Sequence, residues 1–292
     1  MKLDLAIISD GGLGKQIALT ALTKKLNEKY GKVAIISGYP EVFFNNKFVY
    51  RNFYFQHPYL YEDYLKDTNV KRIEPYLTYE YRFQNKHLIE AFCKTLDIEY
   101  DQEMKPMIFL IPQEEIEVLQ YKQQIGKYIL LQITGGPGYG PSPNRDWPVD
   151  EAQRFVDLFN KAFPEIKIIQ ILLPNQPVLR GVIRMSHLNR RQIFPLMKHC
   201  ESFVVIDSFL NHLSAAFDKK GVVLFGGTSP ERLGYKHNVN LMKDKCICPE
   251  RPCHISDFAS HLGKVQGCNY DYDCMKIDAE TVFEKLKEIL KT

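Results

Sequence analysis

Apolar and polar positions along the chain form short blocks that match strands and helices in turn. Leu3 to Ser9 is an apolar run, and after the turn Asp10-Gly11-Gly12 apolar residues recur at helical spacing over 17–26. Gly31 ends that helix, and Val33 to Ser37 forms a second apolar run. The pattern predicts a strand-helix-strand unit with parallel strands and a right-handed crossover.

The same rhythm returns in the second half of the chain. Strands are predicted at Tyr128–Ile133, Ile166–Leu173, Phe203–Ile206 and Val222–Phe225, and helices at Val149–Phe163, Leu210–Phe217 and Ala279–Leu290. Because strands alternate with helices, this half is expected to form a second parallel sheet.

The segment between these halves has weaker periodicity. It is rich in aromatic residues over 50–92, and a short strand is predicted over 105–112. Residues 113–127 are polar and helix-prone, which suits a linker between domains. We therefore expect an N-terminal domain over 1–119 and a C-terminal domain over 120–292.

Composition and charge narrow the class of protein. Apolar residues make up 45% and charged residues 25%, as in globular proteins, and the net charge of +3 is spread along the chain. This argues against a nucleic-acid partner. No apolar run approaches the roughly 18–20 residues that span a bilayer, and the N-terminal run resembles a first strand more than a signal peptide. We expect a cytoplasmic protein with at most peripheral membrane contact.

Seven cysteines without a secretion signal favour reduced thiols or metal ligands over a disulfide framework. Five of them fall between Cys246 and Cys274 in an irregular segment. A tetrahedral zinc or iron site is predicted, with unliganded thiols and a disulfide as alternatives. Its expected ligands are Cys248, Cys253, Cys268 and Cys274.

The glycine loop Ser9–Lys15 lies between a strand end and a helix start, where free backbone N–H groups favour an anion. Gly12 and Gly14 would allow close approach of a phosphate. A Walker-type nucleotide loop is an alternative, but it requires Ser or Thr where this chain has Gln16. A second alternative is that the loop is a turn needed only for packing.

Two further loops follow strands of the second half. Asp207 and Ser208 end one strand, with His212 on the next helix, and Gly227 ends the following strand. Ligands of open α/β sheets bind at such strand ends, although Asp207 or Ser208 could equally serve only as a helix cap.

The other loop carries Thr134 and Gly135 and leads through Arg145 to Trp147-Pro148. Arg145 is expected to face incoming phosphates. The alternative is a surface connection that Trp147 anchors in the core.

The order and spacing of these motifs resemble glycosyltransferase family nine, the heptosyltransferase-like enzymes. The motifs are GGLGKQI near the N-terminus, Arg145-Asp146-Trp147-Pro148, DSFLNHLSAAF, VVLFGGTSPERLG and Cys274-Met275-Lys276-Ile277. The resemblance covers residues 1–40 and 128–292 and is weak between 40 and 105.

The resemblance implies an α/β protein of the GT-B type, with two Rossmann-like domains whose parallel sheets face an interdomain cleft. It implies an inverting transfer that needs no catalytic metal, from a nucleotide-sugar donor, often ADP-heptose, to a lipopolysaccharide-type glycan, a lipid-linked or a protein acceptor. By position, Thr134 and Arg145 would meet the phosphates. Asp207, Ser208 and His212 would surround the donor sugar and diphosphate.

The chain departs from the family at Lys15, where the family usually has an aspartate that acts as general base. A lysine is protonated at neutral pH unless it is strongly desolvated. We therefore expect Asp10 to supply the base and Lys15 to neutralise diphosphate or acceptor charge, with a desolvated Lys15 as the competing base. An inactive nucleotide-sugar-binding member and a nucleotide-hydrolysing enzyme are the alternative functions.

Overall fold

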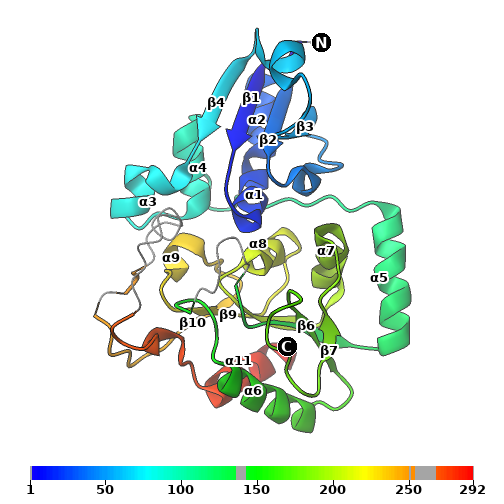
Figure 1. Ribbon diagram of the computed structural model, residues 1–292, viewed down its shortest axis with the longest axis vertical. Helices are drawn as coiled ribbons and strands as arrows, with labels where there is room; N and C mark the ends of the chain where they lie inside the picture. The colour runs from blue at the N-terminus through cyan, green and yellow to red at the C-terminus, as the bar shows by residue number, and fades with distance from the viewer. Residues whose placement is uncertain (1, 136–142, 250, 254–267, 292) are drawn as a thin grey trace. The chain divides into compact units, whose positions relative to one another are not determined.

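The computed structural model describes residues 2–135, 143–249, 251–253 and 268–291, and the chain divides into two compact units, 1–111 and 112–292 (Figure 1). Each unit is built around one sheet in which every strand pair is parallel. The two parallel sheets predicted from the sequence are therefore confirmed.

The sheet of the first unit has the order β3-β2-β1-β4. Its strands are β1 Leu5–Ser9, β2 Val33–Ser37, β3 Arg51–Tyr54 and β4 Asn69–Ile73. The strand order reverses between β1 and β4, and Ser9 pairs with Ile73 at the carboxyl end of this pair. The residues that follow Ser9 and Ile73 thus emerge side by side at the position where open α/β sheets bind ligands.

The predicted first helix consists of three consecutive pieces rather than one. The helical segments of this unit are α1 Leu13–Leu19, η1 Thr20–Leu22, α2 Thr23–Tyr30, η2 Pro40–Phe43, η3 Tyr61–Leu65, η4 Pro75–Leu77, α3 Tyr79–Phe83 and α4 Leu88–Leu96. The prediction of a strand over 105–112 was wrong, because residues 105–111 belong to no strand or helix and α5 begins at Pro112. Two prolines, Pro106 and Pro112, remove backbone donors there, and Met107 N instead donates to the Thr20 side chain at 2.9 Å.

The sheet of the second unit has the order β10-β9-β8-β5-β6-β7. Its strands are β5 Tyr128–Gln132, β6 Lys167–Ile171, β7 Ile183–Met185, β8 Ser202–Ile206, β9 Val222–Phe225 and β10 Val239–Met242. This is the strand order of the dinucleotide-binding fold, with its switch point between β5 and β8. All residues of β5, β8 and β9 are buried, as expected for a parallel sheet covered on both faces.

The helices of this unit cover both faces of the sheet. They are α5 Pro112–Ile125, α6 Val149–Ala162, α7 Arg190–His199, α8 Phe209–Ala216, α9 Pro230–Leu233, η5 Asp273–Met275 and α11 Ala279–Leu290. In Figure 1, α6 and α11 lie on one face, and α7 and α8 on the other. Side chains of α6 and α11 share a core with Ile129, Val204 and Val222, whereas the alternate strand residues point to the opposite face.

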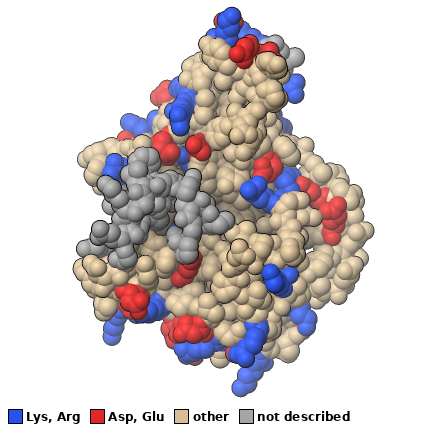
Figure 2. Space-filling model, in the orientation of Figure 1, with Lys and Arg blue, Asp and Glu red and all other residues tan. Residues whose placement is uncertain are grey.

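Helix α5 belongs to the second unit, although its sequence suggested a linker. Val118 is its one buried residue, and the helix instead contacts α7 through ion pairs. Acidic side chains are visible along α5, with basic ones beside them (Figure 2). The compact units divide at residue 111 for this reason, and the expected boundary near 120 falls inside α5.

No helix among the described residues combines the length and the apolar character that crossing a membrane requires.

Candidate functional site

The carboxyl ends of β5, β8 and β9 bring together the strand-end residues that the sequence singled out. These ends carry Thr134-Gly135, Asp207-Ser208 and Gly226-Gly227 respectively. The strands are neighbours in the order β9-β8-β5, and Asp207 N donates to Leu224 O of β9 at 3.0 Å. The three loops therefore lie along one stretch of the carboxyl edge of the second sheet, which includes the switch point between β5 and β8, where ligands of this fold class bind.

Ser208 fastens two of these loops together. Its Oγ accepts from Leu210 N at 3.2 Å, which caps α8, and donates to Gln132 Oε1 at 2.5 Å at the end of β5. Ser208 is thus a cap as well as a residue of this edge. Gln132 was missed by the sequence analysis, because a polar side chain at the end of an apolar strand does not reveal its partner.

His212 lies one turn into α8 and is 4% exposed. Its Nδ1 is 2.8 Å from the hydroxyl of Tyr235, which is itself buried. A hydrogen bond at one ring nitrogen fixes the orientation of an imidazole. Tyr235 is therefore a supporting residue of this edge, and the sequence gave no signal for it beyond its place just after the VVLFGGTSPERLG motif.

The glycines after β9 are required by packing. A Cβ at Gly226 would lie 2.3 Å from Met275 Sδ and 2.7 Å from Asn144 O, and one at Gly227 would lie 2.8 Å from Asn144 Nδ2. Gly227 N also donates to Asn144 O at 2.8 Å. The predicted role of Gly227 at the ligand thus comes with a structural one, which is to let the segment before Arg145 approach β9.

Thr228 follows these glycines and offers a polar atom that the fold does not use. Its side chain is 4% exposed, and its Oγ1 makes no hydrogen bond within the described part of the chain. A buried hydroxyl without a partner is costly unless another molecule satisfies it. Thr228 is therefore a candidate ligand contact that the sequence analysis missed.

The loop after β5 is anchored by Trp147. The indole is 1% exposed, its Nε1 donates to Ile277 O at 2.9 Å, and Trp147 N donates to Ile133 O at 2.8 Å. Arg145 and Thr134 are both half-buried near the two ends of this loop. Anchoring by Trp147 holds Arg145 at the carboxyl edge of the sheet, so the expected anchor and the expected ligand role of this loop are compatible.

Gly135 lies inside a hydrogen-bonded turn of the same loop. Its N donates to Asp146 Oδ1 at 2.6 Å, and its O accepts from Gln176 Nε2 at 2.6 Å. Both polar atoms of the Gly135 backbone thus have partners in the protein. Gly136 lies outside the described residues.

In the first unit, the glycine loop begins α1 with Gly12 as its N-cap. Gly11 has a φ of +98°, and Gly14 lies in the helix. Asp10 is exposed, and its Oδ1 accepts from Gly11 N at 2.7 Å. Gln16 stands where a Walker-type loop has a Ser or Thr hydroxyl that binds magnesium. Its Nε2 donates to Ser9 O at 3.2 Å and to Asp10 O at 3.1 Å. That side chain therefore braces the loop.

Lys15 has a partner that no sequence motif indicated. Its side chain is 1% exposed, and its Nζ is 2.7 Å from Glu74 Oε2. Nζ also lies 5.4 Å from the ring centre of Tyr76, at cation–π distance. Glu74 directly follows β4, so the pair joins α1 to the end of β4, beside the switch point of the first sheet.

The cysteines of the C-terminal segment are gathered near Cys274. Burial raises the pKa of the Cys274 thiol to about 12, and the neighbouring thiols contribute to this rise. Those neighbours are Cys246, Cys253, Cys268 and Cys248. Among the described residues, no three of these sulfur atoms lie within 4.8 Å of one another, so a shared metal would need them to draw closer.

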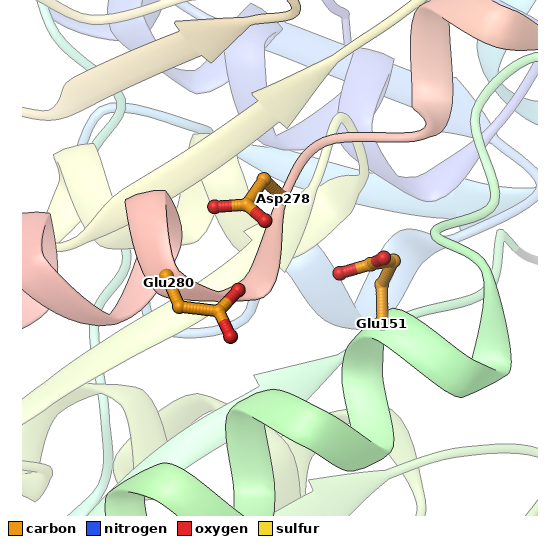
Figure 3. A group of neighbouring side chains, drawn as sticks. All are labelled: Glu151, Asp278 and Glu280. Carbon is orange, nitrogen blue, oxygen red and sulfur yellow. The ribbon is translucent and has the colours of Figure 1, made fainter.

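One compact group of potential metal ligands does occur among the described residues, and it is acidic. It comprises Glu151, Asp278 and Glu280, near the starts of α6 and α11 (Figure 3). Glu151 accepts from Ala279 N at 2.9 Å, and Asp278 accepts from Thr281 N at 2.9 Å, so both carboxylates cap α11.

Arg154 completes this group. Its guanidinium donates to Glu151 Oε1 at 3.0 Å and to Glu280 Oε1 at 2.5 Å. The acidic group therefore joins α6 to α11 and has a cation in the protein. We assign it a structural role.

Residues 179–256 match the sequence model of glycosyltransferase family 9 (heptosyltransferase). This range includes β8, α8 and β9, which carry two of the three loops of the site. No curated protein sequence matches the chain.

Solved structures align over the whole chain. A family 9 glycosyl transferase from Veillonella parvula has a TM-score of 0.72 and 13% identity, covering 100% of this chain and 99% of that one. The ADP-heptose lipopolysaccharide heptosyltransferase II of E. coli has a TM-score of 0.59 and 12% identity, covering 99% of both chains.

The iron-containing dodecameric glycosyltransferase TibC from enterotoxigenic E. coli has a TM-score of 0.70 and 12% identity, covering 100% of this chain and 78% of that one. At these identities the structural likeness shows the fold. Because the matched family and these structures are all of glycosyltransferases, they support the prediction of an enzyme of this class. The GT-B class of fold is confirmed, and the match over 179–256 confirms the resemblance of this chain to glycosyltransferase family 9.

Proposed function

We propose that this chain is an inverting glycosyltransferase that moves a sugar, with heptose favoured, from a nucleotide sugar to a hydroxyl of a glycan. The observation that carries the proposal is the carboxyl edge of the second sheet. There Thr134, Asp207 and Thr228 lie on three adjacent strand ends at the switch point, and the family 9 match spans two of those strands.

An ADP-sugar is the favoured donor. Structures of E. coli heptosyltransferase WaaC were solved with ADP and with ADP-2-deoxy-2-fluoro heptose, and one of TibC with ADP-D-β-D-heptose. A lipopolysaccharide-type glycan is the favoured acceptor, since one aligned structure is a lipopolysaccharide heptosyltransferase. Lipid-linked and protein acceptors remain to be tested alongside it.

In this proposal the donor binds at the carboxyl edge of the second sheet. The side chains of Arg145 and Thr134 contact the diphosphate, and Asp207 and His212 contact the sugar and its phosphate. A guanidinium suits a diphosphate because it donates several hydrogen bonds in one plane. Tyr235 holds His212 in place through the contact at 2.8 Å.

The reaction is a single displacement. The acceptor oxygen forms a bond to the anomeric carbon while the bond from that carbon to the phosphate oxygen breaks. The electron pair leaves with the nucleoside diphosphate, and the hydroxyl proton passes to a carboxylate of the protein. Stabilisation of the charge that develops on the diphosphate supplies much of the rate enhancement.

The test is a panel of ADP-, UDP- and GDP-sugars, with binding measured by calorimetry and transfer measured with deacylated lipopolysaccharide oligosaccharides as acceptors. We expect ADP-heptose to bind and its heptose to move to the oligosaccharide with inversion. Binding without transfer across the panel would favour an inactive binding protein, which the lysine at position 15 makes the main rival. Nucleotide hydrolysis without sugar transfer would favour the hydrolase.

We also propose a structural zinc or iron ion held by Cys248, Cys253, Cys268 and Cys274. The thiols lie close enough to influence Cys274, and soft thiolates suit either metal. The proposed sugar transfer does not involve this ion. Because the aligned structure of TibC is described as iron-containing, iron is as reasonable an occupant of this cysteine site as zinc.

A further inference from the structure

Glu74 occupies the second strand end at the switch point of the first sheet. Strands β1 and β4 are adjacent, and Ser9 pairs with Ile73, so Asp10 and Glu74 are the first residues beyond the paired ends. The sequence analysis found Asp10 because it lies in the glycine loop. Glu74 lies in the aromatic segment, where no motif was recognisable.

The ion pair of Glu74 is asymmetric in its exposure. The Lys15 side chain is 1% exposed, whereas the Glu74 side chain is 37% exposed. Lys15 Nζ holds Glu74 Oε2 at 2.7 Å, and Tyr76 N donates weakly to Oε1 at 3.4 Å. A buried cation thus fixes one oxygen of a carboxylate whose other side is open to water.

Gly11 leaves the space that this arrangement needs. A Cβ at Gly11 would lie 3.1 Å from Lys15 Cδ, and the φ of +98° is one that side-chain-bearing residues rarely adopt. The glycine loop therefore shapes the path of the Lys15 side chain toward β4 as well as starting α1.

We propose that Glu74 is the general base of the transfer and that Lys15 is its positioning residue, an inference that rests on the proposed function. The acceptor hydroxyl donates its proton to Glu74 as its oxygen bonds to the anomeric carbon, and the proton then passes to solvent. Fixing the carboxylate in advance removes a reorganisation step from the reaction.

Asp10 and Lys15, the two alternative bases, are less suitably placed to accept a proton than Glu74. The Asp10 carboxylate is turned back onto its own loop by the Gly11 N–H at 2.7 Å, and the residue is exposed to bulk water. Lys15 Nζ already donates to Glu74 Oε2 at 2.7 Å, and an ammonium group has no lone pair with which to take a proton.

The experiment compares Glu74→Gln, Lys15→Met and Asp10→Asn, with Asp97→Asn as a matched control. Asp97 is also an ion-paired carboxylate of the first unit, 2.6 Å from Lys29 Nζ. The probes are ADP-heptose as donor and deacylated lipopolysaccharide oligosaccharides as acceptors. Turnover is measured against pH, donor affinity by calorimetry, and folding by circular dichroism.

We expect Glu74→Gln to lower kcat by about 10²–10⁴-fold with unchanged donor affinity and to abolish the acid limb of the pH profile. Lys15→Met should lower kcat by a smaller factor, again at constant donor affinity, and Asp97→Asn should match the wild type.

Near wild-type turnover in folded Glu74→Gln would overturn the inference while leaving the proposed function intact. Loss of turnover in Asp10→Asn alone would do the same and assign the base to Asp10. A more than tenfold loss of donor affinity in Lys15→Met, with Glu74→Gln fully active, would show that Lys15 binds diphosphate instead. If the wild type binds no nucleotide sugar and transfers none, the proposed function fails, and the inference fails with it.

Discussion

At the scale of single residues, the side chains of the proposed site fall into two groups, those proposed to contact the donor and those that hold the loops. Trp147, Ser208 and Tyr235 belong to the second group, because their polar atoms contact Ile277, Gln132 and His212 respectively. Arg145 belongs to the first group in our proposal. We expect the two groups to respond differently to substitution, with changes in the first group weakening donor binding and changes in the second group destabilising the fold.

Arg145→Ala should weaken ADP-heptose binding by roughly ten- to a hundredfold, because a charge-assisted phosphate contact contributes about 1.5–3 kcal/mol. Calorimetry measures this directly, with circular dichroism to check the fold. Arg180→Ala is the control, since Arg180 is an exposed arginine of the same unit. Equal donor affinity in both variants would remove Arg145 from the site.

Gly226→Ala should destabilise the protein by about 1–3 kcal/mol, because its methyl group would meet Met275 Sδ and the backbone oxygen of Asn144. Gly12→Ala is the matched control. Gly12 has a φ of −72°, and a Cβ there would have no atom within 4 Å. Denaturant unfolding of both variants checks the prediction, and equal midpoints would contradict it.

At the scale of elements, α5 shows that a helix can be held in place by charge. Arg191 contacts both oxygens of Glu114, at 2.7 and 2.5 Å, and Lys122 contacts Glu201 at 2.9 Å. Glu115 contacts Lys198 and His199 on α7. With a single buried residue in α5, these contacts make its position sensitive to pH and salt.

Burial alone would raise the pKa of Glu115, but hydrogen bonds from Lys198 and His199 lower it below its ordinary value. A lowered pKa in the folded state stabilises the fold above the pKa of the unfolded chain, about 4.3 for a glutamate. This contribution is lost as the pH falls through the folded-state pKa. Stability should therefore decline on acidification below about pH 4.5.

Glu115→Gln tests this contribution. It should cost about 1 kcal/mol or less at neutral pH and low salt, and the difference from wild type should shrink as the pH falls below about 4.5. Urea unfolding at several pH values measures both effects. A difference that grows as the pH falls below about 4.5 would show that the Glu115 ion pairs do not contribute to the stability of α5. Glu117→Gln is a suitable control, since Glu117 is an exposed glutamate of the same helix.

At the scale of the whole molecule, the chain consists of two units with the same plan. In each unit, the strand order reverses beside the first strand, which is β1 in one unit and β5 in the other. A glycine-containing loop follows that strand in both units. The proposed base lies at one reversal and the proposed donor contacts lie at the other. The cysteine segment adds a third feature, which follows β10 in the second unit.

Protein purified without chelators should contain zinc or iron in a stoichiometric amount. Thiols bind a metal as thiolates, so metal binding by these cysteines releases protons. Metal affinity should therefore rise with pH, and Cys274→Ser should lower the metal content. Cys93→Ser is the control, because Cys93 is a buried thiol of the other unit. Elemental analysis that finds only traces of both metals would contradict the site.

The sequence by itself determined the buried strands β1, β2, β5, β6, β8 and β9 and the main helices beside them. The strands over 33–37 and 222–225 and the helix over 279–290 were predicted with the bounds that the structure has, since their apolar period is strong and their ends carry turn or cap residues. β3 and β4 were not predicted, because both are largely exposed and lack a continuous apolar run. Ordered motifs also indicated the family and the three loops of the second unit.

Only the tertiary structure decided which side chains meet. Lys15 and Glu74 are 59 positions apart, Ser208 and Gln132 are 76 apart, and Trp147 and Ile277 are 130 apart. Local periodicity carries no information about such contacts, because they depend on strand order, and strand order is set by how whole layers pack. The placement of β4 beside β1 is what gives Lys15 its carboxylate partner, since that pairing brings Glu74, in the middle of the aromatic segment, next to the glycine loop.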